Sequence, residues 1–250
     1  MKIQTSNKGV YLGRKRKFPF SKIYLSEKEI GHHVQIVGAS GFGKTVLISH
    51  IVKSRIENGQ GLLFIDQKGD LETIELFSTF VRNANREKDL KVFSLSDSTK
   101  SAPYNLLNNG TATELRDRIM GSLNWSEEFY KNQASSFLLS LLTGLTILRE
   151  KVKLQLDLHL LYSLLKDPKS IFELSKEITL DDRFEKEVLE ESARFLSHQE
   201  NAHSLQGLKT QLQSICYSGF KDSVRGSLEG IDLFETVRQG KLVFTFLDTR

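Results

Sequence analysis

The first hundred residues alternate between short apolar runs, rich in β-branched side chains, and longer stretches in which apolar residues recur every three or four positions. The runs read HVQIVG (33–38), GLLFID (61–66) and KVFSLS (91–96), and the helical stretches begin at about Lys44 and at Leu71. Such runs predict buried strands, and the periodic stretches predict helices between them. The order predicts an α/β fold with a mainly parallel sheet, because parallel strands need crossover connections.

The pattern changes after residue 110, where the strand signals stop. Thr111 with Glu114, and Ser170 with Glu173, have the spacing of a capping box ahead of helical patterns. The last apolar run, GKLVFTFLD, predicts a strand that returns to the sheet. The sequence therefore predicts an inserted all-α subdomain, with these ranges: 1–30 a lead-in, 31–110 the first part of the core, 111–219 the insertion, and 220–250 the return to the core.

The composition fits an ordered globular chain, since 39% of the 250 residues are hydrophobic, 26% are charged and only 3 are proline. The net charge of +4 is compatible with a polyanionic partner but does not indicate one. The one dense basic run, GRKRKF (13–18), is interpreted as a solvated face, with phosphate contact as the alternative. The stretch from Asn132 to Leu148 is too short and too polar for a membrane span, and predicts a buried helix.

The single cysteine, Cys216, excludes an internal disulfide and suits a reducing compartment. We interpret it as a small buried hydrophobic residue. The start of the chain lacks the apolar region of a signal peptide, so we expect a cytoplasmic protein. The histidine pairs have no further ligands at metal spacing and are interpreted as structural residues. These pairs are His32 with His33 and His198 with His203.

The segment GASGFGKT, from Gly38 to Thr45, matches the pattern G-x-x-x-x-G-K-[ST]. Glycines let consecutive backbone N–H groups turn toward a phosphate, and the following helix adds partial positive charge. We expect Lys44 to reach the β- and γ-phosphates of ATP and the Thr45 hydroxyl to bind Mg²⁺. The motif follows a predicted strand and opens a predicted helix, as it should. The expected nucleotide-binding residues are Gly38, Ala39, Ser40, Gly41, Phe42, Gly43, Lys44, Thr45 and Val46.

An acid that organises Mg²⁺ is expected at the end of a neighbouring strand. Asp66 ends the run LLFID, with Asp70 in the turn after it, and Asp248 ends the last run. Neither Asp66 nor Asp248 is followed by Glu, the usual residue for polarising the attacking water, so the spacing does not rank them. An Asp that caps a turn is the alternative for each.

The order of several segments resembles the FtsK/HerA superfamily and, within it, the coupling-protein ATPases of conjugative type IV secretion. FIDQKGD is similar to the family's D-P-K-G-[DE] pattern, and APYNLL is similar to its YNPL. Beside the loop itself, the matching segments are YLG (11–13), FIDQKGD (64–70), APYNLL (102–107), NWSEEFYKNQA (124–134), LLYSLLKDP (160–168), LKTQLQSI (208–215) and IDLFETVRQGKLVFTFLDT (231–249).

The resemblance implies a RecA-like motor core with an all-α insertion, homo-hexameric rings around a channel, and DNA translocation driven by ATP hydrolysis. It matches Asp66 to the acid of the second-strand motif, as the candidate catalytic and Mg²⁺-binding residue, with Gln67 in place of the usual Pro. It also implies membrane-associated secretion machinery as a partner and a peripheral place at the inner membrane face.

In the family, the hydrolytic Asp-Glu pair follows the strand that resembles KLVFTFLD, after a further helix. The sequence stops at Arg250, so the resemblance predicts a C-terminal truncation that lacks this pair, and slow hydrolysis. A non-catalytic nucleotide-binding module is therefore an alternative to the motor. A small-molecule kinase is a second alternative, which the apolar, Glu/Lys-rich insertion disfavours because such kinases need an arginine-rich lid.

Overall fold

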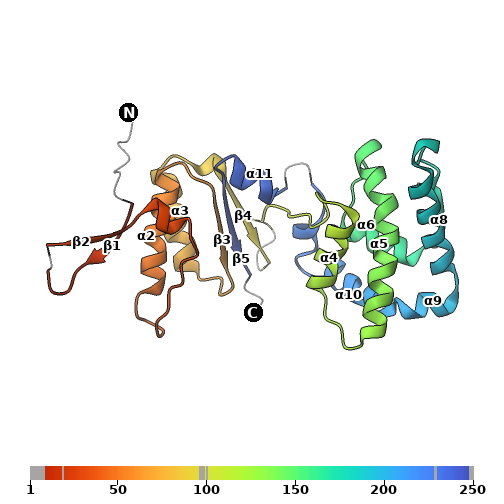
Figure 1. The fold of residues 1–250 in the computed structure, drawn as a ribbon, viewed down its shortest axis with the longest axis horizontal. Helices are drawn as coiled ribbons and strands as arrows, with labels where there is room; N and C mark the ends of the chain where they lie inside the picture. Colours follow the sequence, from red (N-terminus) through yellow and green to blue (C-terminus); the bar gives the residue numbers. More distant parts are fainter. Residues whose placement is uncertain (1–8, 19, 96–98, 100, 228–229, 248–250) are drawn as a thin grey trace. The chain divides into compact units, whose positions relative to one another are not determined.

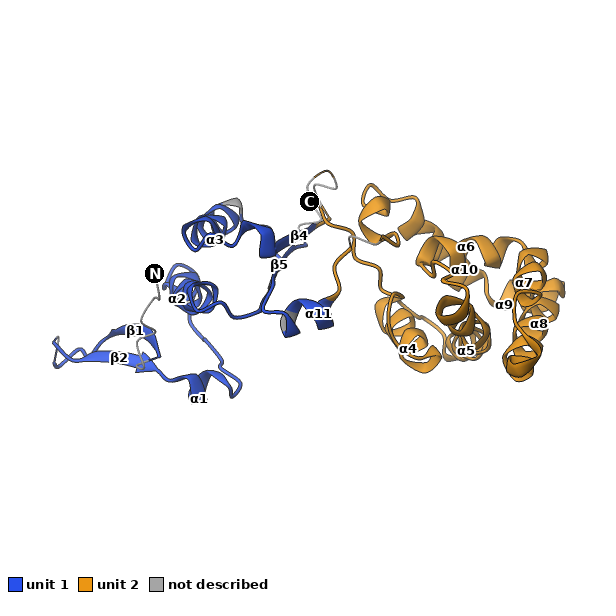
Figure 2. Cartoon of the chain, turned by 90° about the horizontal axis from the view of Figure 1, so that it is seen from above, with its two compact units in different colours: residues 1–93, 233–250 blue, residues 94–232 orange. Residues whose placement is uncertain are grey.

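The computed structural model describes residues 9–18, 20–95, 99, 101–227 and 230–247 (Figure 1). The chain divides into two compact units: unit 1 comprises residues 1–93 and 233–250, and unit 2 comprises residues 94–232 (Figure 2). Unit 1 contains strands and helices, and unit 2 is helical. The predicted α/β fold with an inserted all-α part is confirmed.

The sheet of unit 1 has its last strand in the middle. The strand order is β3 (Leu62–Asp66), β5 (Leu242–Phe246), β4 (Leu90–Ser94). β5 pairs with β3 in parallel, with Phe64 opposite Phe244. A central strand is covered on both faces, and four of the five residues of β5 are buried. The last apolar run therefore returns to the sheet, as its pattern predicts.

Helices cover the two faces of this sheet unequally. Figure 2 shows α2 (Lys44–Glu57) and α3 (Leu71–Asn83) on one side and the short α11 (Leu233–Arg238) on the other. On the side of α3, the ring of Phe77 lies 4.8 Å from that of Phe64 and 5.8 Å from that of Phe244, both edge-on. Aromatic pairs in this geometry add to the free energy of burial, so these rings hold α3 on the β3–β5 pair.

One arginine joins three segments at the opposite end of α2 from its first turn. The guanidinium of Arg86 donates hydrogen bonds to the carbonyls of Ile56 at 3.0 Å, Gln60 at 3.2 Å, and Gly240. It also donates to the carboxylate of Asp89 at 2.9 Å. Only 11% of its side chain is exposed, so these bonds replace water that the guanidinium has lost. Arg86 thus ties the end of α2 to the start of β5.

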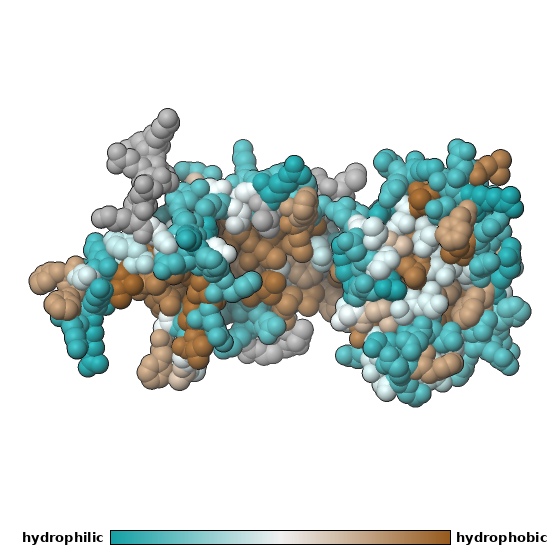
Figure 3. Space-filling model, in the orientation of Figure 1, coloured by the Kyte–Doolittle hydropathy of each residue, from teal (hydrophilic) through white to brown (hydrophobic). Residues whose placement is uncertain are grey.

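Residues 33–38 do not form a strand, so the prediction of a first core strand here is wrong. An apolar, β-branched run supplies the side chains of a strand, but a strand also needs a partner for its backbone. Among the described strands none pairs with this segment, and Val37 is 82% exposed. On β3, at the edge of the sheet, Ile65 is 56% exposed. Figure 3 shows the apolar residues that gather on this part of unit 1.

The described part of the expected lead-in forms an antiparallel hairpin of β1 (Val10–Arg14) and β2 (Lys22–Leu25), followed by α1 (Glu27–Ile30). Ser26 and Glu29 make a capping box at the start of α1. Val10 is buried, and the hairpin packs on α2. These residues are therefore part of the fold of unit 1.

Unit 2 is built around α5 (Glu128–Lys151), whose buried face packs on α4 and α8. No helix among the described residues is long and apolar enough to cross a membrane. The described residues from 101 to 227 contain no strand. The other helices of the unit are α4 (Ala112–Ser122), α6 (Leu158–Lys166), α7 (Pro168–Ser175), α8 (Arg183–Ser197), α9 (Gln199–Ser204) and α10 (Gln206–Cys216). The short 3-10 helix η2 (Leu180–Asp182) lies between α7 and α8, η3 (Lys221–Val224) follows α10, and η1 (Glu87–Asp89) is in unit 1.

Unit 2 comprises residues 94–232. It therefore begins before residue 111 and ends after residue 219, which are the bounds that the sequence pattern predicted for the insertion. The segment ahead of α4 is bound to the helices: Asn105 donates to the carbonyl of Leu156 at 2.8 Å, and Arg149 donates to the carbonyls of Leu107 and Gly110 at 3.1 and 2.7 Å. Such side-chain contacts with the backbone of a loop leave no trace in hydrophobic periodicity.

The two predicted capping boxes have different outcomes. At α4, Thr111 and Glu114 make the reciprocal hydrogen bonds of the box. The box predicted for Ser170 and Glu173 is wrong, because α7 begins earlier, with Asp167 as the N-cap and Pro at the first helical position. Asp167 accepts from the backbone N–H of residue 169 at 3.1 Å and from the hydroxyl of Ser170. A proline at the first turn starts a helix because its missing N–H is not needed there.

The core of unit 2 contains the single cysteine. Cys216 is buried, as expected, and burial raises the pKa of its thiol to about 11. A thiol in this state is mostly protonated at neutral pH and is a poor nucleophile.

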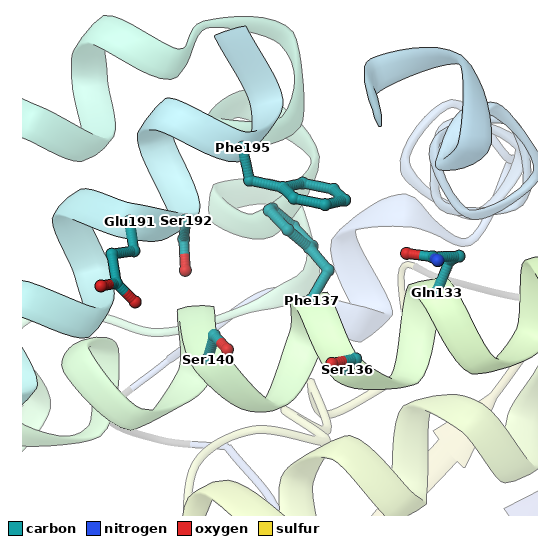
Figure 4. Close-up of a pocket in the computed structure, with 7 residues that line it drawn as sticks. All are labelled: Gln133, Ser136, Phe137, Ser140, Glu191, Ser192 and Phe195. Atoms are coloured by element: carbon teal, nitrogen blue, oxygen red, sulfur yellow. The ribbon is translucent and has the colours of Figure 1, made fainter. Parts of the chain in front are cut away.

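Small residues let α5 and α8 approach each other closely. Figure 4 shows a cavity between them, lined by Ser136 and Ser140 of α5 and by Ser192 of α8, beside the ring of Phe137. Further along α5, a Cβ atom placed on Gly144 would lie 2.7 Å from the Cβ of Leu189 on α8. The interface therefore has no room for a side chain at Gly144.

We expect Gly144→Ala to destabilise the protein by about 1–3 kcal/mol, because overpacking forces the two helices apart. The control is Gly121→Ala in α4, where nothing lies within 4 Å of the added atom; it should stabilise by about 0.5 kcal/mol through helix propensity. Urea unfolding followed by circular dichroism measures both. Equal midpoints for the two variants would contradict the close α5–α8 contact.

Candidate functional site

The glycine-rich loop leads directly into α2, whose first residue is Lys44. Gly41 and Gly43 have φ values of 80° and 79°, in the left-handed region that glycine tolerates best. Gly43 is the N-cap of α2, no side chain caps this end, and the first turn contains no acidic residue. The N–H groups of a first helical turn have no partner within the helix. Together with the helix dipole, they favour an anion at this position.

Lys44 folds back over the loop. Its Nζ atom donates to the carbonyl oxygens of Gly38 at 2.8 Å and Ala39 at 2.7 Å. The ammonium group is thereby held against the start of the loop. Backbone N–H groups, an ammonium group and the hydroxyl of Thr45 are donors and ligands suited to a polyphosphate with its Mg²⁺. The residues of the loop therefore fit a bound polyphosphate with its Mg²⁺.

The loop is open to solvent. Ser40, Phe42, Thr45 and Val46 are exposed, and Lys44 is half-buried. The structure thus brings the predicted residues 38–46 together at one helix end.

The acid Asp66 lies at the end of β3, where its side chain shapes the turn into α3. Its carboxylate oxygens accept the backbone N–H groups of Lys68 at 3.0 Å and Asp70 at 3.1 Å. Gly69, between them, has a φ of 63°. Asp66 therefore has the turn-forming role that the sequence left open as the alternative.

Asp70 is the N-cap of α3. Its carboxylate accepts from the hydroxyl of Thr73 at 2.6 Å and from the N–H of Glu72 at 3.3 Å. The hydrogen bond from Thr73 is the main reason that the pKa of Asp70 lies below its ordinary value.

The remaining candidates add nothing to the site in the part of the chain that the structure describes. Asp248 lies outside the described residues. His32 and His33 are exposed, and no group of three or more His, Cys, Asp or Glu side chains in the described part of the chain is arranged to hold a metal. His203 instead lines a pocket of unit 2 with Trp125 and Tyr130. Sequence reasoning missed this pocket, because its residues come from the segment that leads into α5, from the first turn of α5, and from α9 and α10.

A family model described as "Helicase HerA, central domain" matches residues 10–236. The chain therefore belongs to this family, which confirms the resemblance to the FtsK/HerA superfamily. The match includes the glycine-rich loop, Asp66 and the whole of unit 2.

Individual relatives match over shorter parts. An uncharacterized protein of Mycoplasma pneumoniae is 29% identical over an alignment of 106 residues, and the match covers 34% of this chain and 88% of that protein. The type 4 coupling protein DotL of Legionella pneumophila is 22% identical over an alignment of 151 residues, and the match covers 54% of this chain and 19% of that protein.

Two solved structures of the bacterial conjugative coupling protein TrwB are also similar, one unbound and one in complex with the ATP analogue ADPNP. Each is 16% identical to this chain and covers 84% of it, with TM-scores of 0.43 and 0.44. The matched part is 44% and 45% of the TrwB chains. This chain thus spans less than half the length of either coupling protein.

The cap of α3 predicts a pH dependence of stability. The pKa of Asp70 is lowered in the folded state, so its ionised form stabilises the fold above the ordinary value of 3.8, and this contribution is lost as the pH falls through the lowered pKa. Asp70→Ala should therefore be less stable than wild type at pH 7, and the gap should narrow in acid. Urea unfolding midpoints at pH 7 and in acid measure this difference in stability, with Glu75→Ala as the control. A gap that stays constant, or that the control reproduces, would contradict this role.

Proposed function

We propose that the chain binds ATP with Mg²⁺ through residues 38–46 and is the nucleotide-binding part of a DNA-translocating motor of the coupling-protein type. One observation carries the first half of this proposal: the glycine-rich loop stands at an uncapped helix N-terminus with the ammonium group of Lys44 turned into it. The two alternatives, a non-catalytic nucleotide-binding module and a small-molecule kinase, would bind nucleotide through the same combination, so this observation supports nucleotide binding and not the motor itself.

Each residue has a part in this proposal. The N–H groups of the loop and the first turn of α2 hold the phosphates. Lys44 exchanges the carbonyls of Gly38 and Ala39 for phosphate oxygens, which are stronger acceptors because they are charged. Thr45 supplies a hydroxyl ligand, and Asp66 is the candidate second ligand and catalytic acid. Bound ATP and Mg²⁺ would supply the phosphoryl group and the charge that neutralises it.

The second half of the proposal is supported by family membership and by the sequence similarity to the coupling protein DotL. DNA is the partner that this similarity suggests, together with secretion machinery. A homo-oligomeric ring is the assembly that we propose, because P-loop motors of this superfamily act as rings.

A specific observation favours a second candidate, a module that binds nucleotide without turnover. The carboxylates of Asp66 and Asp70 both accept hydrogen bonds where β3 turns into α3, so both of these acids have a structural role. This role supports a site that binds nucleotide without an acid to activate water.

The nucleotide site is tested by Lys44→Ala. Removing the ammonium group leaves the backbone donors in place, so ATP affinity should fall by about 10- to 100-fold, the worth of a charge-assisted hydrogen bond. The control is Lys53→Ala, which removes the same charge from the exposed face of α2, where Lys53 pairs with Glu57 at 3.8 Å. Titration calorimetry with ATP and Mg²⁺ gives the affinities. Equal losses in both variants, or none in either, would refute the assignment.

The motor is tested by thermodynamic coupling, which does not require turnover. If nucleotide and DNA act on one machine, a non-hydrolysable ATP analogue should change the affinity for DNA, and DNA should change the affinity for the analogue by the same factor, about 5- to 150-fold. Lys44→Ala should remove this coupling. Nucleotide binding without coupling would support the second candidate, and phosphate transfer to a small acceptor would support a kinase.

A further inference from the structure

The β1–β2 hairpin is fixed at its base. Tyr11 on β1 lies edge-on to Tyr24 on β2, with ring centroids 5.8 Å apart, and to His50 of α2 at 6.1 Å. The backbone N–H of Lys15 donates to the carbonyl of Ser21 at 2.9 Å, which closes the loop beyond the strands. The hairpin therefore projects from α2 as an ordered element (Figure 1).

The far end of the hairpin combines exposed aromatic rings with positive charge. We call residues 14–18 and 20–23 the hairpin tip. Phe18 is 67% exposed and Phe20 is 94% exposed. Five cations accompany them, and the sequence has no carboxylate from residue 1 to residue 26. In Figure 3, apolar and hydrophilic residues lie side by side at this end of the hairpin. The cations are Arg14, Lys15, Arg16, Lys17 and Lys22, and all are exposed.

We infer that the hairpin tip docks on a bilayer surface that contains anionic lipid. Phe18 and Phe20 enter the boundary between headgroups and acyl chains, and the basic side chains lie among the lipid phosphates. Such a surface satisfies both features at once, since hydrocarbon removes the rings from water and the negative surface potential attracts the cations. The described helices offer no membrane span, so this contact is peripheral.

The shape and chemistry of the tip favour lipid over nucleic acid. A hairpin end is convex, whereas single strands bind in grooves where bases stack on aromatic rings. Residues 14–23 also contain no Asn or Gln, the side chains that read adenine. On an intact duplex, the cations would contact phosphates, but Phe18 and Phe20 would remain in water unless bases unstacked.

The contact is tested by co-sedimentation of the full chain with vesicles of phosphatidylcholine alone or mixed with phosphatidylglycerol. Wild type should bind the mixed vesicles and not the neutral ones, and added salt should weaken binding. The combined change Phe18→Ser and Phe20→Ser should lower the partition coefficient at least about tenfold, since two buried rings are lost. Replacing Lys15, Arg16 and Lys17 by Gln should lower it by a similar factor.

Matched variants in unit 2 control for general loss of apolar surface and charge. Leu180→Ser with Phe184→Ser removes exposed apolar side chains, Phe184 being 67% exposed as Phe18 is. Lys169, Lys176 and Arg183 changed to Gln remove three charges. Both control variants should bind as wild type does. If the control variants reduced vesicle binding as much as the hairpin-tip variants do, the inference would be overturned.

A direct reading of insertion comes from Phe20→Trp. The only native tryptophan, Trp125, is in unit 2, so lipids with brominated acyl chains should quench the variant and leave the wild-type signal unchanged. Absence of quenching, at lipid concentrations that bind the protein, would contradict insertion. The phenylalanine variants should keep their affinity for single- and double-stranded oligonucleotides. Loss of oligonucleotide binding with vesicle binding retained would assign the tip to nucleic acid instead.

Discussion

The parallel pairing of β5 with β3 is the constraint on which the fold of unit 1 depends. The two strands lie far apart in the sequence, and Phe64 and Phe244 of this pair meet Phe77 of α3 in one aromatic cluster. Between β4 and β5 the chain makes the whole of unit 2. Because β5 is the middle strand, β4 can join the sheet only when the chain has returned from unit 2 to form β5. Contacts of such long sequence separation are costly in chain entropy, and the apolar burial of β5 offsets this cost.

The sheet positions one side of the candidate site more firmly than the other. Asp66 is the last residue of β3, and its carboxylate sets the turn into α3. The glycine-rich loop is held differently, by the first turn of α2 and by the hydrogen bonds of Lys44, since no described strand pairs with residues 33–38. The position of the glycine-rich loop therefore depends on α2, and the position of Asp66 depends on the sheet.

A feature could be predicted from the sequence where its cause lies in neighbouring residues, and could not be predicted where its cause lies in distant ones. The starts of α2 and α3 follow from sequence signals within or next to each helix, and the cap of α4 by Thr111 follows from a spacing of three residues; all three were predictable. The absence of a strand at 33–38 was not predictable, because a strand depends on a pairing partner that the apolar pattern does not identify. Likewise, nothing around Arg86 indicates that its guanidinium binds carbonyls of residues 56, 60 and 240.

The helix α2 connects the features of unit 1 for which we propose a function. Its first turn holds the glycine-rich loop, its middle packs on the hairpin through His50, and its end is tied to β5 by Arg86. Arg55, near that end, donates to Glu27 of α1 at 2.9 Å and to Gln60 at 2.6 Å. A helix of 14 residues is stiff along its axis because every interior turn is hydrogen-bonded. If a phosphate bound at the first turn displaced α2, the helix would carry this displacement to the base of the hairpin, and the Arg86 contacts would oppose it at the other end.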